Sequence, residues 1–154
     1  MRFFQVLSLR TQLNLKACRL ASDLVILLRS SVDGVVQEQL TTSALKLCQQ
    51  ARKIVIPGAA KFLETASVTI PSIRMANHLA AGVVHQNKDY RVVVANVFFT
   101  FAFHCPPALL TKLGAEFFTK ILKTTVVDAL PPVREVSRLT LWALRKTFPG
   151  PIDQ

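Results

Sequence analysis

Glycine and cysteine are scarce in this chain of 154 residues. It has five glycines, and its eight prolines fall between apolar runs rather than within them. This distribution disfavours a glycine-rich β fold and favours helices. The three cysteines are Cys18, Cys48 and Cys105. Their odd number and apolar neighbours exclude a complete disulfide framework, and we expect buried free thiols in a reducing compartment.

Acidic residues are also few. Nine acidic residues stand against nineteen basic ones, which gives a formal net charge of +10. This excess favours an acidic partner, which could be a nucleic acid, an anionic membrane or an acidic protein. Charge alone does not choose among these three.

Motifs of enzyme chemistry are missing from the sequence. There is no Ser-His-Asp order, no glycine-rich phosphate loop and no paired-carboxylate arrangement. His78, His85 and His104 are far apart, and no cysteine or histidine pair has the spacing of metal ligands. We therefore predict no enzyme, no metal site, no cofactor and no small-molecule substrate.

Periodic apolar runs dominate the rest of the chain. Apolar residues make up 51% of it and the mean hydropathy is +0.36, which excludes disorder. Apolar side chains recur at three- and four-residue steps, which predicts an all-α fold in one domain. After a helix end over 3–9, we expect about seven helices, over 11–31, 36–50, 56–66, 73–84, 90–104, 108–127 and 132–148.

Three features of these runs need an interpretation. Residues 1–22 carry four bases and no acid, as transit peptides do, but the apolar spacing continues past Asp23 and favours an ordinary basic helix pair. Residues 92–105 are strongly apolar, yet Pro106 ends the run short of the ~20 residues that a membrane span needs. We predict a buried helix there. Trp142 is expected on the inner face of the last helix, packed in the core.

Short breaks interrupt the helices near residues 10, 52, 88 and 131, about forty residues apart. Such a period, with two helices in each unit, is typical of HEAT or armadillo arrays, so the predicted fold is an α-solenoid of HEAT-like hairpins. Stacking would align the breaks along one edge. We expect Asp89 and Asp128 to cap helix starts and to hold Arg91 and Arg134. The edge residues that we single out are Arg10, Thr11, Arg52, Lys53, Asn87, Lys88, Arg91 and Arg134.

Four segments carry a resemblance to a known family. VVDALPPVREVSRLTLWALRKTFP (126–149) resembles the closing repeat of the TOG domains in the CLASP family of microtubule-associated proteins. QNKDYRVVVANVF (86–98) resembles the penultimate repeat, LSLRTQLNLKAC (7–18) a middle repeat and CQQARKIVIPGAAKFL (48–63) the repeat after it. The matches follow the family's order over nearly the whole chain.

The resemblance implies one TOG-like domain over 1–154, a paddle of HEAT repeats that binds tubulin through its intra-repeat loops. About four repeats are present, and the family's first repeats have no counterpart here. The matching loop positions are the eight edge residues, with Arg134 serving the fold more than the contact. The implied partner is tubulin or the microtubule, and the implied location is the cytoplasmic cytoskeleton, with spindle and kinetochore as candidate places.

Two other functions stay open. A HEAT scaffold without tubulin affinity would bind its partners through helix faces. A nucleic-acid-binding helical repeat would show a steep salt dependence. We rank the second last, because the chain lacks the exposed aromatic residues interleaved with bases that single-strand binders use.

Overall fold

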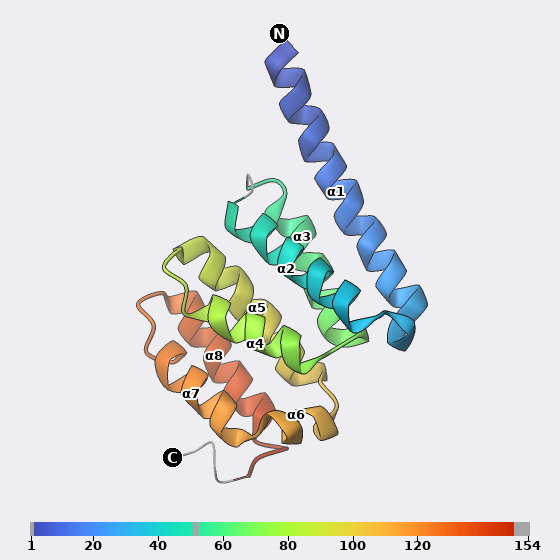
Figure 1. Ribbon diagram of the computed structural model, residues 1–154. Helices are drawn as coiled ribbons and strands as arrows, with labels where there is room; N and C mark the ends of the chain where they lie inside the picture. The colour runs from blue at the N-terminus through green and yellow to red at the C-terminus, as the bar shows by residue number, and fades with distance from the viewer. Residues whose placement is uncertain (1, 51–52, 150–154) are drawn as a thin grey trace. The chain divides into compact units, whose positions relative to one another are not determined.

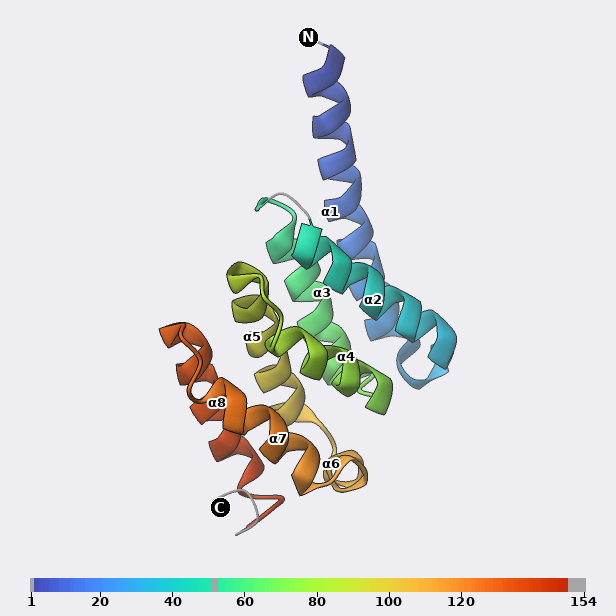
Figure 2. The same cartoon turned by 60° about the vertical axis from the view of Figure 1, so that its left-hand side comes forward.

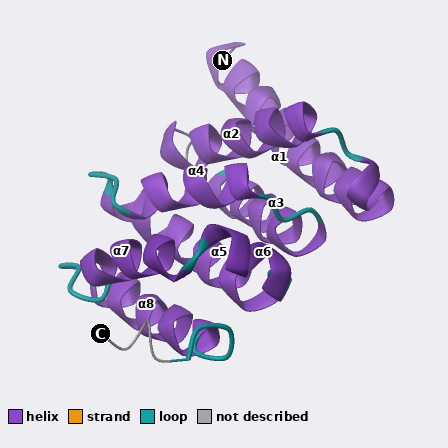
Figure 3. Ribbon diagram, turned by 60° about the horizontal axis from the view of Figure 1, so that its bottom comes forward, coloured by secondary structure: helices purple, strands orange, loops and turns teal. Residues whose placement is uncertain are grey.

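The computed structural model describes residues 2–50 and 53–149 of the chain. Every regular element in these ranges is helical, as Figure 3 shows, and the all-α prediction is confirmed. The chain divides into two compact units, residues 1–70 and 71–154. We describe each unit by itself.

The first unit is built on a long N-terminal helix. Helix α1 (Arg2–Leu28) continues into a short 3-10 turn, η1 (Arg29–Ser31), and two further helices follow, α2 (Gly34–Gln50) and α3 (Ile56–Thr69). Helix α3 lies between the other two and packs against both (Figure 1). Its start at Ile56 is as predicted, since Pro57 then occupies the first turn, where no intrahelical donor is needed.

The core of the first unit gathers around α3. Phe62, Leu63 and Ala66 of that helix are fully buried, and α2 contributes Ala44 and Cys48. Close approach of α1 depends on Gly58, because an added Cβ there would lie 3.0 Å from the Leu15 side chain. A side-chain hydrogen bond from Gln37 Nε2 to the carbonyl oxygen of Ile70 connects the start of α2 to the end of α3.

Two predictions for α1 are wrong. The expected break at Arg10 and Thr11 does not exist, since both residues lie inside an uninterrupted helix. The apolar spacing of 11–31 also predicts an inner stripe of Leu13, Ala17, Leu20, Ala21, Leu24, Leu27 and Leu28. Most of this stripe faces outward: Leu13 and Leu27 are 66% and 78% exposed, while Cys18 and Val25 are buried instead. Leucine, arginine and lysine are all strong helix formers, so the residues around Arg10 continue the helix instead of forming a turn. The resulting helix has two apolar faces, one buried and one exposed.

The second unit contains two helical hairpins and a short connecting helix. Helices α4 (Ile73–Val83) and α5 (Lys88–His104) form the first hairpin, and α7 (Ala115–Thr125) and α8 (Pro131–Leu144) form the second. Helix α6 (Pro107–Leu113) connects them. Helix α5 packs against both α4 and α8, and its close approach to α4 depends on Gly82, where an added Cβ would lie 2.8 Å from Val94 Cγ1.

Helix α5 is the buried helix that the sequence predicts. Its residues Val94, Val97 and Phe101 have no measurable exposure, and Phe98 contacts Phe118 of α7 with ring centroids 6.0 Å apart. The predicted single helix over 108–127 is wrong. It is divided at Gly114, whose φ of 81° lies in the left-handed region that favours glycine.

Two further details of the second unit differ from expectation. Trp142 lies on the outer side of α8 and is 57% exposed, because Val133, Ser137 and Thr140 form the buried face. The helix cap before α5 is Asn87 rather than Asp89. Its side-chain oxygen accepts a hydrogen bond from the Tyr90 N–H at 3.2 Å.

Candidate functional site

The loop between α4 and α5 is closed by one arginine. Nη1 of Arg91 donates hydrogen bonds to the carbonyl oxygens of His85 and Gln86, at 2.8 and 3.3 Å. Nδ1 of His85 accepts from the N–H of Asn87 at 3.0 Å. The His85 ring also lies edge-on to Tyr90, with centroids 5.0 Å apart. These contacts among the residues of the loop and the first turn of α5 hold the loop in one conformation.

The loop between α7 and α8 repeats this arrangement. Nη1 of Arg134 donates to the carbonyl oxygens of Asp128 and Ala129, at 2.7 and 3.1 Å. Oδ1 of Asp128 accepts from the N–H of Leu130 at 2.8 Å. These bonds span the same residue offsets as those of the first loop, and 43 residues separate the two sets (91 to 134 and 85 to 128). The repeat predicted from the sequence is thus confirmed in bonding detail for this pair of loops.

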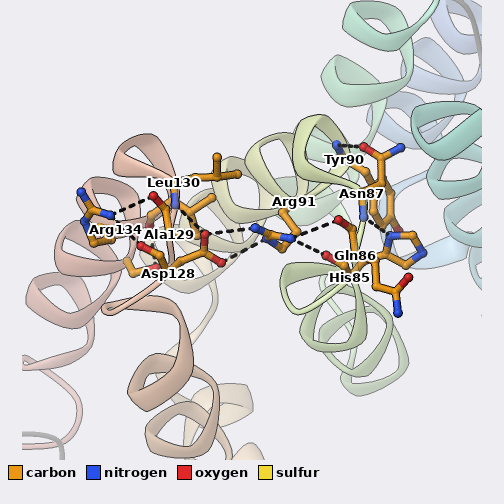
Figure 4. Close-up of polar contacts among 11 residues, drawn as sticks. His85, Gln86, Asn87, Tyr90, Arg91, Asp128, Ala129, Leu130 and Arg134 are labelled. Atoms are coloured by element: carbon orange, nitrogen blue, oxygen red, sulfur yellow. Dashed lines mark hydrogen bonds and ion pairs between the residues drawn. The ribbon is translucent and has the colours of Figure 1, made fainter.

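A salt bridge joins the two loops (Figure 4). Nε of Arg91 lies 3.1 Å from Oδ2 of Asp128, and Nη2 of Arg91 donates to Oδ1 at 3.2 Å. The two side chains are 14% and 13% exposed, so water screens the pair only weakly. The loops consequently lie side by side as one edge of the second unit, which we call the loop edge (residues 84–91 and 126–134). The pairing differs from the expectation: Arg91 is held by Asp128 rather than by its neighbour Asp89, and Arg134 contacts the backbone of Asp128 rather than its carboxylate. Asp128 also does not cap α8, whose N-cap is Leu130.

Cations remain exposed on the loop edge. Lys88, at the first position of α5, is exposed, and so is the capping residue Asn87. Arg134 is half-buried, and its Nη1 is engaged by the two loop carbonyls (Figure 4). Asp128 is already engaged by Arg91, whereas Asp89 is exposed and offsets part of the field. The edge can thus offer a positive, pre-shaped surface to an acidic partner.

The residues predicted for the first unit are placed differently. Arg10 is exposed and Thr11 half-buried on α1, so neither lies in a loop. Lys53 is exposed in the turn before α3, as expected for an edge residue. Arg52 lies outside the described residues. Of the eight predicted positions, the structure therefore brings together the four of the second unit, Asn87, Lys88, Arg91 and Arg134.

His85 is the residue that the sequence interpretation missed. We gave it no role, yet it takes the place in the first loop that Asp128 takes in the second. The signal was available in the sequence, because His85, Asn87 and Arg91 have the same mutual spacing as Asp128, Leu130 and Arg134. His85 and Asp128 both accept a backbone hydrogen bond, but one is an imidazole and the other a carboxylate. A comparison of residue types alone therefore does not show that the two positions are equivalent.

Other chemistry is not assembled in the described ranges. Groups of three or more metal-binding side chains do not occur there. The three cysteines are free and buried, and burial raises the pKa of the Cys105 thiol to about 11 and that of Cys48 to about 12, with the neighbouring Cys18 adding to the second shift. These thiols stay protonated at neutral pH and are poor nucleophiles.

Membrane-spanning potential is limited to one bent segment of the described chain. None of its helices alone combines the length and hydropathy of a span. Helices α5 and α6 have the required length and hydropathy only when they are taken together, and they are bent by 119° at the break between them.

Comparison with known proteins gives one family and several distant relatives. The family model "CLASP N terminal" matches residues 2–153. The chain is 28% identical to protein peg1 of Schizosaccharomyces pombe over 94% of its length, and 27% identical to protein stu1 of Aspergillus oryzae over 96%.

These relatives are much longer than this chain. It spans 10% of protein peg1 and 13% of the Aspergillus oryzae protein. No solved structure matches the chain significantly. The family model covers nearly every residue, and the hairpins and the repeated loops of the second unit fit the helical-repeat fold that the resemblance implied. The chain belongs to the CLASP N terminal family.

Proposed function

We propose that this chain is a tubulin-binding module of CLASP type and that the loop edge is the surface that contacts tubulin. Membership of the CLASP N terminal family, which is not a known enzyme family, supports a binding role. The observation that carries the proposal is the Arg91–Asp128 salt bridge, because it aligns the loop that bears the exposed Lys88 with the loop that bears the half-buried Arg134 on one rigid edge. A fixed row of positive groups suits an acidic protein surface better than mobile loops do, since less conformational entropy is lost on binding.

The residues of the loop edge have two different tasks in this proposal. Lys88 and the outer side of Arg134 contact the acidic partner. Arg91 shapes the edge, because its guanidinium is taken up by Asp128 and by two loop carbonyls. In the first unit, Lys53 is a separate candidate contact in the turn before α3, and Arg10 and Thr11 lie within α1. Binding of this kind would influence microtubule growth, pausing or rescue.

A charge-reversal experiment tests the proposal. Lys88→Glu should weaken co-sedimentation with microtubules or capture of free tubulin at low salt by at least about fivefold, because it replaces attraction by repulsion at the edge. Lys112→Glu is the matched control. Lys112 is also an exposed helical lysine, but it lies on α6, which follows the opposite end of α5. Equal binding by both variants and the unmodified chain would remove the loop edge from the contact.

The scaffold alternative predicts the opposite pattern. Reversal of Lys88 would then change nothing, and substitutions on exposed helix faces would abolish partner binding. Binding measurements on these variants therefore distinguish the two functions. Circular dichroism checks that each variant keeps its helices.

A further inference from the structure

Helix α1 carries a second apolar face that no other described helix of the first unit covers. Leu13, Leu20, Leu24 and Leu27 are 66%, 59%, 44% and 78% exposed, and Ala17 between them is exposed as well. With 3.6 residues per turn, these five positions lie on one stripe along the helix. Single exposed leucines are ordinary on a protein surface, but a continuous row of them marks an interaction site.

The stripe points away from the core of the first unit. Cys18 and Val25, the buried residues of α1, lie on the opposite side of the helix and face α3. Figure 2 shows that the N-terminal half of α1 also extends beyond α2 and α3. A partner can therefore approach the stripe without displacing any element of the unit.

The spacing of the stripe selects a helix as the partner. Positions 13, 17, 20, 24 and 27 alternate steps of four and three residues, which is the heptad pattern of a seam between two helices. Helices that lie on a lipid surface bury a wider apolar face. On α1 charged Lys16 and Asp23 border the stripe directly on one side, and the exposed Leu28 extends it only at its C-terminal end.

We propose that the stripe binds a second copy of the same chain, with the two α1 helices antiparallel and a two-fold axis at Leu20. Leu13 then meets the partner's Leu27, Ala17 meets the partner's Leu24, and the two Leu20 side chains meet each other. The stripe is nearly symmetric about Leu20, with members three or four and seven residues away on either side. Such self-complementarity is what an isologous interface requires.

Charge supports this register. Lys16 lies four residues before Leu20 and Asp23 three residues after it, both on the same border of the stripe. The two-fold axis therefore places Lys16 within about 1.5 Å, one residue of helix rise, of the level of the partner's Asp23, and the pair occurs twice. A parallel pairing would instead bring two Arg10 side chains together on the seam and leave Lys16 without an acid. The antiparallel arrangement avoids both.

Sedimentation velocity over roughly 1–100 µM tests the proposal, because self-association depends on concentration. We expect the 17.1 kDa chain to shift from monomer towards dimer. Leu20→Glu should weaken the dimer at least about tenfold, because it buries two carboxylates at the centre of the seam. Val127→Glu is the control, since Val127 is 75% exposed and belongs to the second unit rather than to the stripe.

A charge exchange tests the register. Lys16→Glu and Asp23→Lys should each weaken the dimer several-fold, and the double variant should recover it, because the swapped charges again face each other. A chain that stays monomeric at every concentration overturns the proposal, and so does a dimer that Leu20→Glu leaves intact. Binding of the monomer to anionic vesicles through the stripe would overturn it as well. A double variant that fails to recover contradicts the antiparallel register.

Discussion

Arg91 and Asp128, 37 residues apart in the chain, form the salt bridge that ties one helical hairpin of the second unit to the next. The same arginine closes its own loop and the same aspartate caps its own turn. The side chains that shape each loop therefore also join the two loops, which makes the loop edge a single structural unit.

Loss of either partner should destabilise the second unit. We expect Arg91→Ala and Asp128→Ala each to lower the free energy of unfolding by about 2–3 kcal/mol, because the remaining charged group is nearly buried and loses its partner. The double variant should cost less than the sum of the two, with a coupling energy of about 1–2 kcal/mol. Chemical denaturation measures all three.

Arg138 supplies the control for this cycle. It is an exposed arginine on α8, so Arg138→Ala should change the free energy of unfolding by less than about 0.5 kcal/mol. Additive effects of Arg91→Ala and Asp128→Ala would contradict the direct coupling of the two loops.

Gly82 should not tolerate even the smallest side chain. In Gly82→Ala the new Cβ would meet Val94 Cγ1 at 2.8 Å and the Tyr90 hydroxyl at 3.1 Å, inside the contact of α4 with α5. We expect a loss of about 1–3 kcal/mol in the free energy of unfolding, although alanine is the better helix former.

Gly34→Ala provides the comparison. Gly34 begins α2, and an added Cβ there would meet nothing within 4 Å. Thermal unfolding should therefore show a lower midpoint for Gly82→Ala and an unchanged or higher one for Gly34→Ala. Equal midpoints would mean that the two helices are less closely packed than described.

Alkaline pH should destabilise the first unit through Cys48. Burial raises the pKa of this thiol from 9.0 to about 12. Above pH 9 the unfolded chain releases the proton while the folded chain retains it, so the folded state is disfavoured as the pH rises. Below pH 9 both states are protonated and the thiol has no effect.

Between pH 9 and the pKa of Cys48 in the folded chain, we expect the free energy of unfolding to fall by about 1.4 kcal/mol per pH unit. Unfolding by urea at pH 8, 9 and 10 measures it. Cys48→Ala removes this titration, so its stability relative to the unmodified chain should improve from pH 9 to pH 10. A constant difference between the two proteins would contradict the raised pKa.

Trp142 should report an aqueous environment. It is the single tryptophan, 57% exposed, with Nζ of Lys146 5.9 Å from its ring centroid. Its fluorescence should be red-shifted and quenched by iodide, and Trp142→Ala should cost less than about 1 kcal/mol. A blue-shifted emission insensitive to iodide would instead place the ring in the core.

Local patterns predicted the second unit well. The breaks predicted near residues 88 and 131 coincide with the starts of α5 and α8, and the dense apolar run of α5 became the central helix. The spacing of three and four residues identified which segments are helical, because this periodicity does not depend on which elements pack against the segment. The repeat between the loops at 84–91 and 126–134 was also visible in the sequence.

Predictions that depend on which neighbour covers a helix failed. The leucine stripe of α1 and Trp142 of α8 were both expected to face the core, yet both are exposed. An amphipathic pattern gives a stripe but not the identity of the element against it, and a helix with two apolar stripes leaves the choice open. The break at Arg10 failed for a related reason, since a basic polar pair is compatible with a helix interior.

Equilibrium binding of purified tubulin to the unmodified chain, at about 50 and about 300 mM salt, tests the central claim most directly. The loop-edge account predicts clear binding at low salt that weakens at high salt, that Lys88→Glu reduces at least about fivefold, and that Lys112→Glu leaves unchanged. Absence of tubulin binding at low salt by a folded chain, or binding indifferent to both salt and Lys88→Glu, would contradict it.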